Sequence, residues 1–261
     1  MKKQIFAVAT AAALTVSAHA SRSVNLQIDG TTQPYQGTLT DGVTYYPMEP
    51  LLCALGDWTV TWDAPTATAM ATDGTNALIA NPTANTITYN QQTYPATVYI
   101  QDGTTYIPVR LVLNLQGGSA QWDGYYGGVA ITSPTASYNA MDYYWLSRVI
   151  SAESQGEQYD GQIAVGQVVV NRVLSDTFPH SIADVIFDTN YGTQFEPTAN
   201  ATIYLDPTAS AQAAAHEVLT SGGSVLGDDV QYFYAPTLSQ GTWIRANRVY
   251  YTSIGCHDFY L

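Results

Sequence analysis

Positive charge is scarce in this chain. The 261 residues carry 8 Lys+Arg against 21 Asp+Glu, which gives a formal net charge of −13 at pH 7. A surface that binds nucleic acid needs clustered cations, and an anionic membrane attracts basic segments for the same reason. We therefore expect neither nucleic acid nor an anionic membrane as a partner.

Cysteine and histidine are also few. Cys53 and Cys256 lie in different halves of the sequence, so a single disulfide and two free thiols are both compatible with an exported chain. The histidines after residue 20, which are His180, His216 and His257, do not have the spacing of metal ligands. We expect no catalytic metal and no other cofactor.

Long apolar runs are missing as well, because none reaches the roughly 20 residues that span a bilayer. Residues 1–20 combine Met1-Lys2-Lys3, a short apolar stretch and Ala18-His19-Ala20, a pattern typical of a secretory signal peptide. An uncleaved anchor is the alternative. We expect a secreted or cell-wall-associated monomer that has no membrane contact once the signal is cleaved.

The remaining residues are rich enough in apolar and aromatic side chains to fold as one large or two small domains. An internal repeat marks the first part, where 41–47 recurs as 102–108 and each copy ends on Trp-Asp, at Trp62-Asp63 and Trp122-Asp123. Asp-Gly predicts a hairpin turn, followed by a strand, a short helix near the proline and a strand with the tryptophan. The pattern predicts a duplicated, β-rich module over 24–131.

This repeat resembles the copper amine oxidase N-terminal domain, an accessory module of secreted bacterial proteins. The segment has no histidine and only Cys53, so we expect no copper site despite the family's name. Trp58, Trp62 and Trp122 would suit a sugar-binding face, but we expect them in the core. Residues 132–141 have the composition of a linker, and 142–261 follow as a second domain.

The second domain is organised around residues 145–172, which predict two helices broken at Gln155-Gly156. Glu153 falls in the last turn of the first helix, either exposed to solvent or facing a cleft. Further along, Ser181 is expected to cap a short helix. Asp206-Pro207 is expected to start an alanine-rich helix that ends at Gly222-Gly223, and the residues beyond, including Trp243, predict short strands and loops.

The central stretch resembles the catalytic domain of spore-cortex-lytic (SleB-type) bacterial cell-wall hydrolases. The resemblance is carried by Ala152-Glu153, Gly156-Glu157, Tyr159-Asp160-Gly161-Gln162, Ala164-Val165-Gly166 and Val170-Asn171-Arg172. It implies an α+β, lysozyme-like domain that cleaves peptidoglycan glycan strands. Where the family has asparagine, this chain has Ala235 and Cys256, which leaves a non-catalytic wall-binding protein as an alternative.

The resemblance also implies roles for residues. Glu153 is the expected catalytic acid/base of a lytic transglycosylase, and Gln194-Phe195 falls where the family has a Gln-Phe pair beside the groove. Aromatic faces suit sugar rings, so Tyr232, Tyr234 and Trp243 complete the expected substrate-binding set. A hydrolytic muramidase would need a second carboxylate, for which the candidates are Glu157, Asp160 and Glu196. Otherwise we expect Glu157 at an exposed helix start, Arg172 paired with an acid in the core, and His257 in a structural hydrogen bond.

Overall fold

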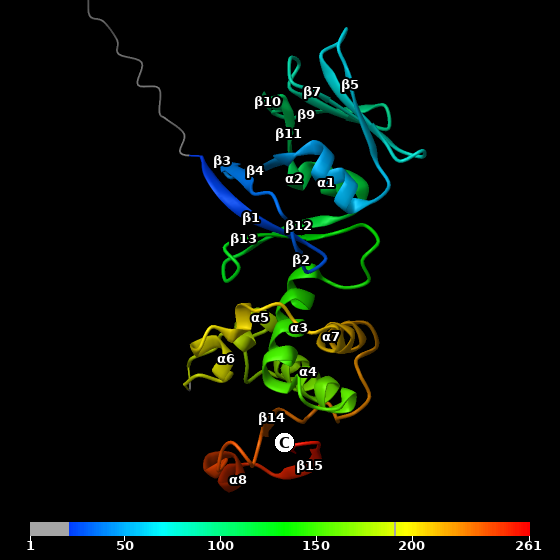
Figure 1. The fold of residues 1–261 in the computed structure, drawn as a ribbon. Helices are drawn as coiled ribbons and strands as arrows, with labels where there is room; N and C mark the ends of the chain where they lie inside the picture. Colours follow the sequence, from blue (N-terminus) through cyan, green and yellow to red (C-terminus); the bar gives the residue numbers. More distant parts are fainter. Residues whose placement is uncertain (1–20, 191) are drawn as a thin grey trace, which may run out of the picture.

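The structure, a computed structural model, describes residues 21–190 and 192–261. The predicted signal peptide, residues 1–20, lies outside the described residues. Figure 1 shows a β-rich N-terminal part above a helical part, with a small sheet at the far end near the C-terminus. The predicted α+β class, with a β-rich N-terminal domain, is confirmed.

The N-terminal part forms two sheets that enclose one apolar core together with helices α1 and α2. Its elements are β1 (Arg22–Ile28), β2 (Thr31–Thr32), β3 (Gly37–Thr40), β4 (Val43–Pro47), α1 (Met48–Leu55), β5 (Thr59–Asp63), β6 (Thr68–Thr72), β7 (Ala77–Asn81), β8 (Thr86–Tyr89), β9 (Gln92–Pro95), β10 (Tyr99–Gln101), β11 (Thr104–Pro108), α2 (Val109–Gln116), β12 (Ser119–Asp123) and β13 (Gly128–Thr132). The larger sheet has the order β10-β11-β4-β3-β1-β13-β12, with β2 on β1, and β5 to β9 form a meander.

The repeat builds the elements that its turn residues predict. Asp41-Gly42 and Asp102-Gly103 both have positive φ at each residue, which is the backbone of a two-residue hairpin turn. Helices α1 and α2 begin directly after Pro47 and Pro108. The expected burial of the tryptophans is only partly right, because Trp58 is in the core whereas Trp62 and Trp122 are 49% and 43% exposed.

Helices dominate the C-terminal part, and a three-stranded sheet closes it. Its elements are α3 (Ala140–Ser154), α4 (Tyr159–Leu174), α5 (Ile182–Ile186), α6 (Glu196–Ala199), the 3-10 helix η1 (Thr202–Tyr204), α7 (Ala209–Ser221), β14 (Tyr232–Tyr234), α8 (Thr242–Asn247), β15 (Tyr250–Ile254) and β16 (His257–Tyr260). Helices α3, α4 and α7 pack on one another around the buried apolar side chains of α3 and α4. The sheet has the order β14-β16-β15.

The predicted break between the first two helices is confirmed, since α3 ends at Ser154 and α4 begins at Tyr159. Ser181 caps α5 as predicted. The predicted start of the alanine-rich helix is wrong, because Thr208 is the N-cap of α7 and accepts a hydrogen bond from the Ala211 amide, while the carboxylate of Asp206 pairs with Arg148. Trp243 lies in helix α8, not in a strand or loop.

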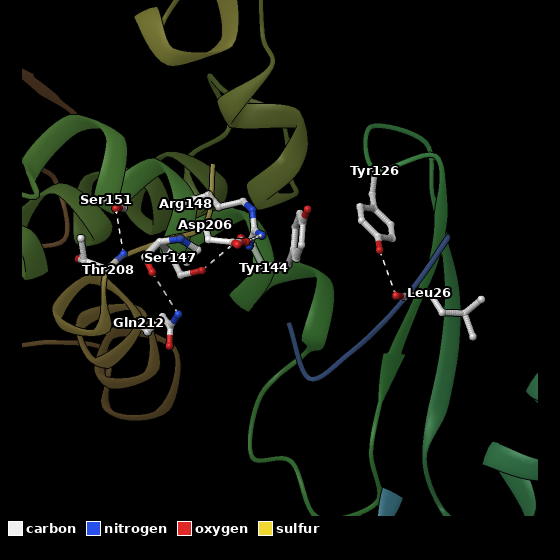
Figure 2. Close-up of polar contacts among 10 residues, drawn as sticks. Leu26, Tyr126, Tyr144, Ser147, Arg148, Ser151, Asp206, Thr208 and Gln212 are labelled. Atoms are coloured by element: carbon white, nitrogen blue, oxygen red, sulfur yellow. Dashed lines mark hydrogen bonds and ion pairs between the residues drawn. The ribbon is translucent and has the colours of Figure 1, made fainter. Parts of the chain in front are cut away.

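The two parts meet along helix α3 and the turn between β12 and β13. Trp145 donates its indole N–H to Asp123 over 2.7 Å, and the ring of Tyr126 meets that of Tyr144 edge to face. Figure 2 shows Tyr126 donating to the Leu26 carbonyl, and the Arg148–Asp206 ion pair beside Tyr144. The Ser133 amide donates to the Asp29 carboxylate and ties the start of segment 132–141 to the N-terminal part, while the Ala140 amide donates to the Thr132 hydroxyl and closes the segment on itself. The division at 131 and 142 stays a prediction.

Candidate active site

Glu153 lies in the last turn of α3, as the sequence predicts. It is half-buried, between the buried Ser151 and Ser154 on one side and the exposed Gln155-Gly156 break on the other. Helix α3 is capped at its N-terminus by Asn139, whose side chain accepts hydrogen bonds from the amides of Met141 and Asp142. A carboxylate here sits at the edge of the helical core and can still be reached.

The surroundings of Glu153 favour its protonated form. Desolvation, with a smaller contribution from the charge of Glu196, raises the pKa of Glu153 to about 7, although the charge of Arg172 acts in the opposite direction. A carboxyl with a pKa near the ambient pH can donate a proton and later take one back. Glu153 therefore has the property required of a general acid/base.

Within residues 21–190 and 192–261, Arg172 forms no ion pair with an acid, contrary to our expectation, although the charges of Asp188 and Glu153 act on its pKa. Its Nε donates to the Gln231 carbonyl over 2.7 Å, and its Nη1 lies 3.5 Å from the Gln194 side-chain oxygen. The guanidinium also lies 4.8 Å from the ring centroid of Phe178 and 5.5 Å from that of Tyr232. Burial lowers the pKa of Arg172 to about 10, so it keeps its charge at neutral pH.

A cleft of about 630 Å³ opens on the side of Arg172. Its lining residues are Arg172, Thr177, Phe178, Thr193, Gln194, Tyr232, Phe233, Trp243, Ile244 and Arg248. Glu153 is not among them, but Arg172 belongs to the cleft and also acts on the pKa of Glu153. A positive charge in the wall of the cleft therefore acts electrostatically on the half-buried carboxyl.

The predicted substrate-binding residues separate into three groups. Gln194, Tyr232 and Trp243 line the cleft together. Tyr234 lies in a neighbouring hollow with Tyr260. Phe195 is 1% exposed and packs with Phe233 in the core, so a substrate cannot reach its ring. Its assignment as a substrate contact is therefore corrected, and Phe195 supports Arg172 from behind.

Glu157 is not an exposed helix-start residue, which corrects our expectation. Its side chain is only 11% exposed and accepts a hydrogen bond of 2.9 Å from the Cys256 amide. Its other oxygen is 3.8 Å from Nδ1 of His257, whose pKa burial lowers. Glu157 thus holds the turn between β15 and β16 against the start of α4. Asp160, in the first turn of α4, is exposed.

Sequence reasoning missed Arg248 and Phe178 as cleft residues. The Arg248 guanidinium lies 4.2 Å from the centroid of Tyr232 and 5.2 Å from that of Trp243, so these side chains form one stacked wall. A signal was present, because arginine is rare in this acidic chain and Arg248 follows Trp243 closely. Phe178 carried no signal beyond its place in a turn.

Within residues 21–190 and 192–261, no cluster of three or more His, Cys, Asp or Glu side chains could hold a metal ion. In the same described ranges, the helices are all too short or too polar to cross a membrane. Cys53 and Cys256 are both free and exposed, so of the two alternatives left open, the structure has the unpaired thiols.

Comparison with protein families gives the class of each part. Residues 156–260 match the Cell Wall Hydrolase family, and residues 26–131 match the Copper amine oxidase N-terminal domain. The C-terminal part therefore resembles cell wall hydrolases and the N-terminal part resembles the copper amine oxidase N-terminal domain, so both predicted resemblances are confirmed. Glu153 lies just before the matched range of the hydrolase family.

The particular relatives are spore cortex-lytic enzymes, to which the C-terminal half is homologous. That of Oceanobacillus iheyensis is 31% identical over 146 residues, which is 56% of this chain and 51% of that protein. That of Bacillus subtilis is 30% identical over 131 residues, or 50% and 41% of the two chains. This chain thus spans about half the length of the relatives it matches, or less. The solved catalytic domain of the germination-specific lytic transglycosylase SleB from Bacillus anthracis is 32% identical, with a TM-score of 0.43 over 48% of this chain and 97% of that one.

Proposed function

We propose that the protein is exported and cleaves the glycan strands of peptidoglycan between N-acetylmuramic acid and N-acetylglucosamine, as a lytic transglycosylase with Glu153 as acid and base. The observation that carries this proposal is the pKa of about 7 that burial gives the Glu153 carboxyl. A substantial fraction of these groups is then protonated at neutral pH, whereas an ordinary glutamate is almost fully ionised.

In the first step, Glu153 donates its proton to the glycosidic oxygen while the bond from that oxygen to C1 of the muramic acid breaks. In the second step, the Glu153 carboxylate takes the proton of the muramic acid's own 6-hydroxyl, and that oxygen bonds C1. The product is a 1,6-anhydro end, no water is consumed, and Glu153 returns protonated for the next cycle.

A single-carboxylate mechanism is supported by the position of Glu157. One of its oxygens accepts from the Cys256 amide and the other lies 3.8 Å from Nδ1 of His257, so its carboxylate belongs to the β15–β16 turn. The cleft beside Arg172 supports a sugar substrate that carries acidic groups. Trp243 is 57% exposed and offers a stacking face, and Arg172 and Arg248 offer positive charge to the carboxylates of stem peptides.

A hydrolytic muramidase is the second candidate, and one observation favours it. The charge of Glu196, at the start of α6, contributes to the raised pKa of Glu153, so a second carboxylate acts electrostatically on the proposed acid. Glu196 is exposed and could activate a water molecule.

Mass spectrometry of the products from purified peptidoglycan separates these functions. We expect 1,6-anhydro-muramic acid ends from the wild-type protein. Reducing ends would contradict the transglycosylase proposal and favour the muramidase. The absence of any soluble product at high protein concentration would contradict both and indicate a non-catalytic wall-binding protein.

A further inference from the structure

The duplicated module builds two equivalent clefts. Strands β4 and β11 pair antiparallel with Pro47 opposite Tyr106 and Tyr45 opposite Pro108. Because Tyr45 corresponds to Tyr106 and Pro47 to Pro108 in the repeat, this register relates the two copies by an approximate two-fold axis. Each cleft is therefore formed by the Asp-Gly hairpin of one copy and the helix start of the other.

The two clefts are similar in size and built from matching segments. The first, about 460 Å³, lies between residues 42–45 of the first hairpin and residues 108–111 at the start of α2. The second, about 560 Å³, lies between residues 103–106 of the second hairpin and residues 47–50 at the start of α1. Because the two clefts share the same backbone arrangement, a difference in what they bind must come from their side chains.

Exposed aromatic rings line only the second of these two clefts. Trp62 and Tyr35 line it and are 49% and 55% exposed. Tyr106 lines it from the opposite side and is braced by Tyr99, which stacks on it at 5.0 Å between centroids. Trp122 corresponds to Trp62 in the repeat and is also exposed, yet it is not among the residues of the first cleft, and Arg22 covers its ring.

The polar groups of the second cleft suit neutral hydroxyls better than anions. Glu49 is the single charged residue of its lining, and Thr61, Thr104 and Thr105 add hydroxyl groups. The first cleft instead contains Arg110 and Asn114. A carboxylate such as Glu49 accepts hydrogen bonds from sugar hydroxyls and repels phosphates, so an anionic wall polymer fits the second cleft poorly.

We infer that the second cleft binds a neutral amino-sugar chain, with Trp62 and Tyr35 stacking on the pyranose rings and Glu49 accepting from their hydroxyls. The inference rests on the proposed function only for the identity of the polymer, which is the glycan backbone of peptidoglycan. The acidic groups of that polymer lie on its stem peptides, whereas the N-acetylated sugar rings that would stack in this cleft are neutral. The elements that line this cleft include α1, β5 and β11, and Figure 1 shows them at the opposite end of the molecule from the C-terminal sheet. The module is also fixed on α3 through Trp145 and Asp123, so a glycan held there lies at a set position relative to Glu153.

The test uses the full chain with Glu153→Gln, so that the ligand is not cleaved. Binding is measured by co-sedimentation with purified peptidoglycan and by calorimetry with a neutral oligomer of N-acetylglucosamine. Trp62→Ala should weaken binding of the oligomer at least about tenfold, because a stacked ring is lost. Trp62→Phe, which keeps a ring, should retain most of the affinity. Trp122→Ala, the equivalent exposed tryptophan outside the cleft, should bind as the parent does.

Three results would each overturn the inference. The first is equal binding by the parent and Trp62→Ala, the second is an equal loss in Trp62→Ala and Trp122→Ala, and the third is no binding by the parent. Circular dichroism of each variant checks that the fold is retained. The result is independent of turnover. If the wild-type protein cleaves peptidoglycan but Trp62→Ala binds normally, this inference fails and the proposed function stands. If the oligomer binds through Trp62 but the wild-type protein yields no products, the proposed function fails instead.

Discussion

At the scale of single residues, the burial that raises the pKa of Glu153 lowers the stability of the fold at neutral and higher pH. Its pKa of about 7 in the native state lies above the value of 4.5 for a free glutamate. Between these two values the native state holds a proton that the unfolded chain has lost, so the free energy of unfolding falls as the pH rises. The full loss in the free energy of unfolding is reached only above pH 7.

Replacing the carboxyl by a neutral amide should remove this cost. We expect Glu153→Gln to be more stable than the wild-type protein at pH 8, by at most about 3 kcal/mol, and equally stable at pH 4. Urea denaturation at both values checks this. Glu196→Gln is the control, because Glu196 is exposed and should give a smaller difference. A Glu153→Gln variant less stable than wild type at pH 8 would contradict the pKa assignment.

Local sequence predicted the position of Glu153 but not the partners that tune it. Its place in the last turn follows from the break at Gln155-Gly156, which lies within three residues. Glu196 and Arg172 reach it only through the packing of α6 and α4 on α3. Glu157 was misjudged for the same reason, since its partner Cys256 is 99 residues away in sequence.

At the scale of elements, the β15–β16 hairpin depends on Gly255. This residue has φ +58, and a β-carbon on it would overlap the Glu157 carboxylate that holds the turn. Gly42 is a matched case in the hairpin between β3 and β4, because it has φ +78 with no atom within 4 Å of an added β-carbon. The two glycines separate backbone strain from steric overlap.

We expect Gly42→Ala to lower the free energy of unfolding by about 1–2 kcal/mol, the cost of a left-handed conformation for an L-residue. Gly255→Ala should lower it by clearly more, because it also displaces Glu157 from the Cys256 amide. Urea unfolding of both variants is the measurement. Equal losses would show that Glu157 does not hold the hairpin.

Elements with local signals were predictable from the sequence. The Asp-Gly turns, the helices after Pro47 and Pro108, and the Ser181 cap all depend on neighbouring residues. The start of α7 was not predictable from the sequence. Asp206 is a good cap by residue type, but its side chain pairs with Arg148 of α3. A cap and an ion pair compete for one carboxylate, and only tertiary structure decides between them.

At the scale of the whole molecule, the arrangement of the parts was not predictable. The first strand, β1, pairs in parallel with β13 at the end of the module, a contact between segments about a hundred residues apart. The repeat predicted two similar units but not that β4 and β11 join them into one sheet. A linker composition at 132–141 gave no sign that Asp123 would bond Trp145 across the junction.

The central claim is that one carboxyl, Glu153, performs the proton transfers. The most direct test is the rate at which folded Glu153→Gln releases soluble fragments from purified peptidoglycan, with Glu196→Gln as the matched carboxyl control. We predict that Glu153→Gln loses at least about a hundredfold in turnover, while Glu196→Gln keeps most of it. A folded Glu153→Gln variant that retains more than about a tenth of wild-type turnover would contradict the account.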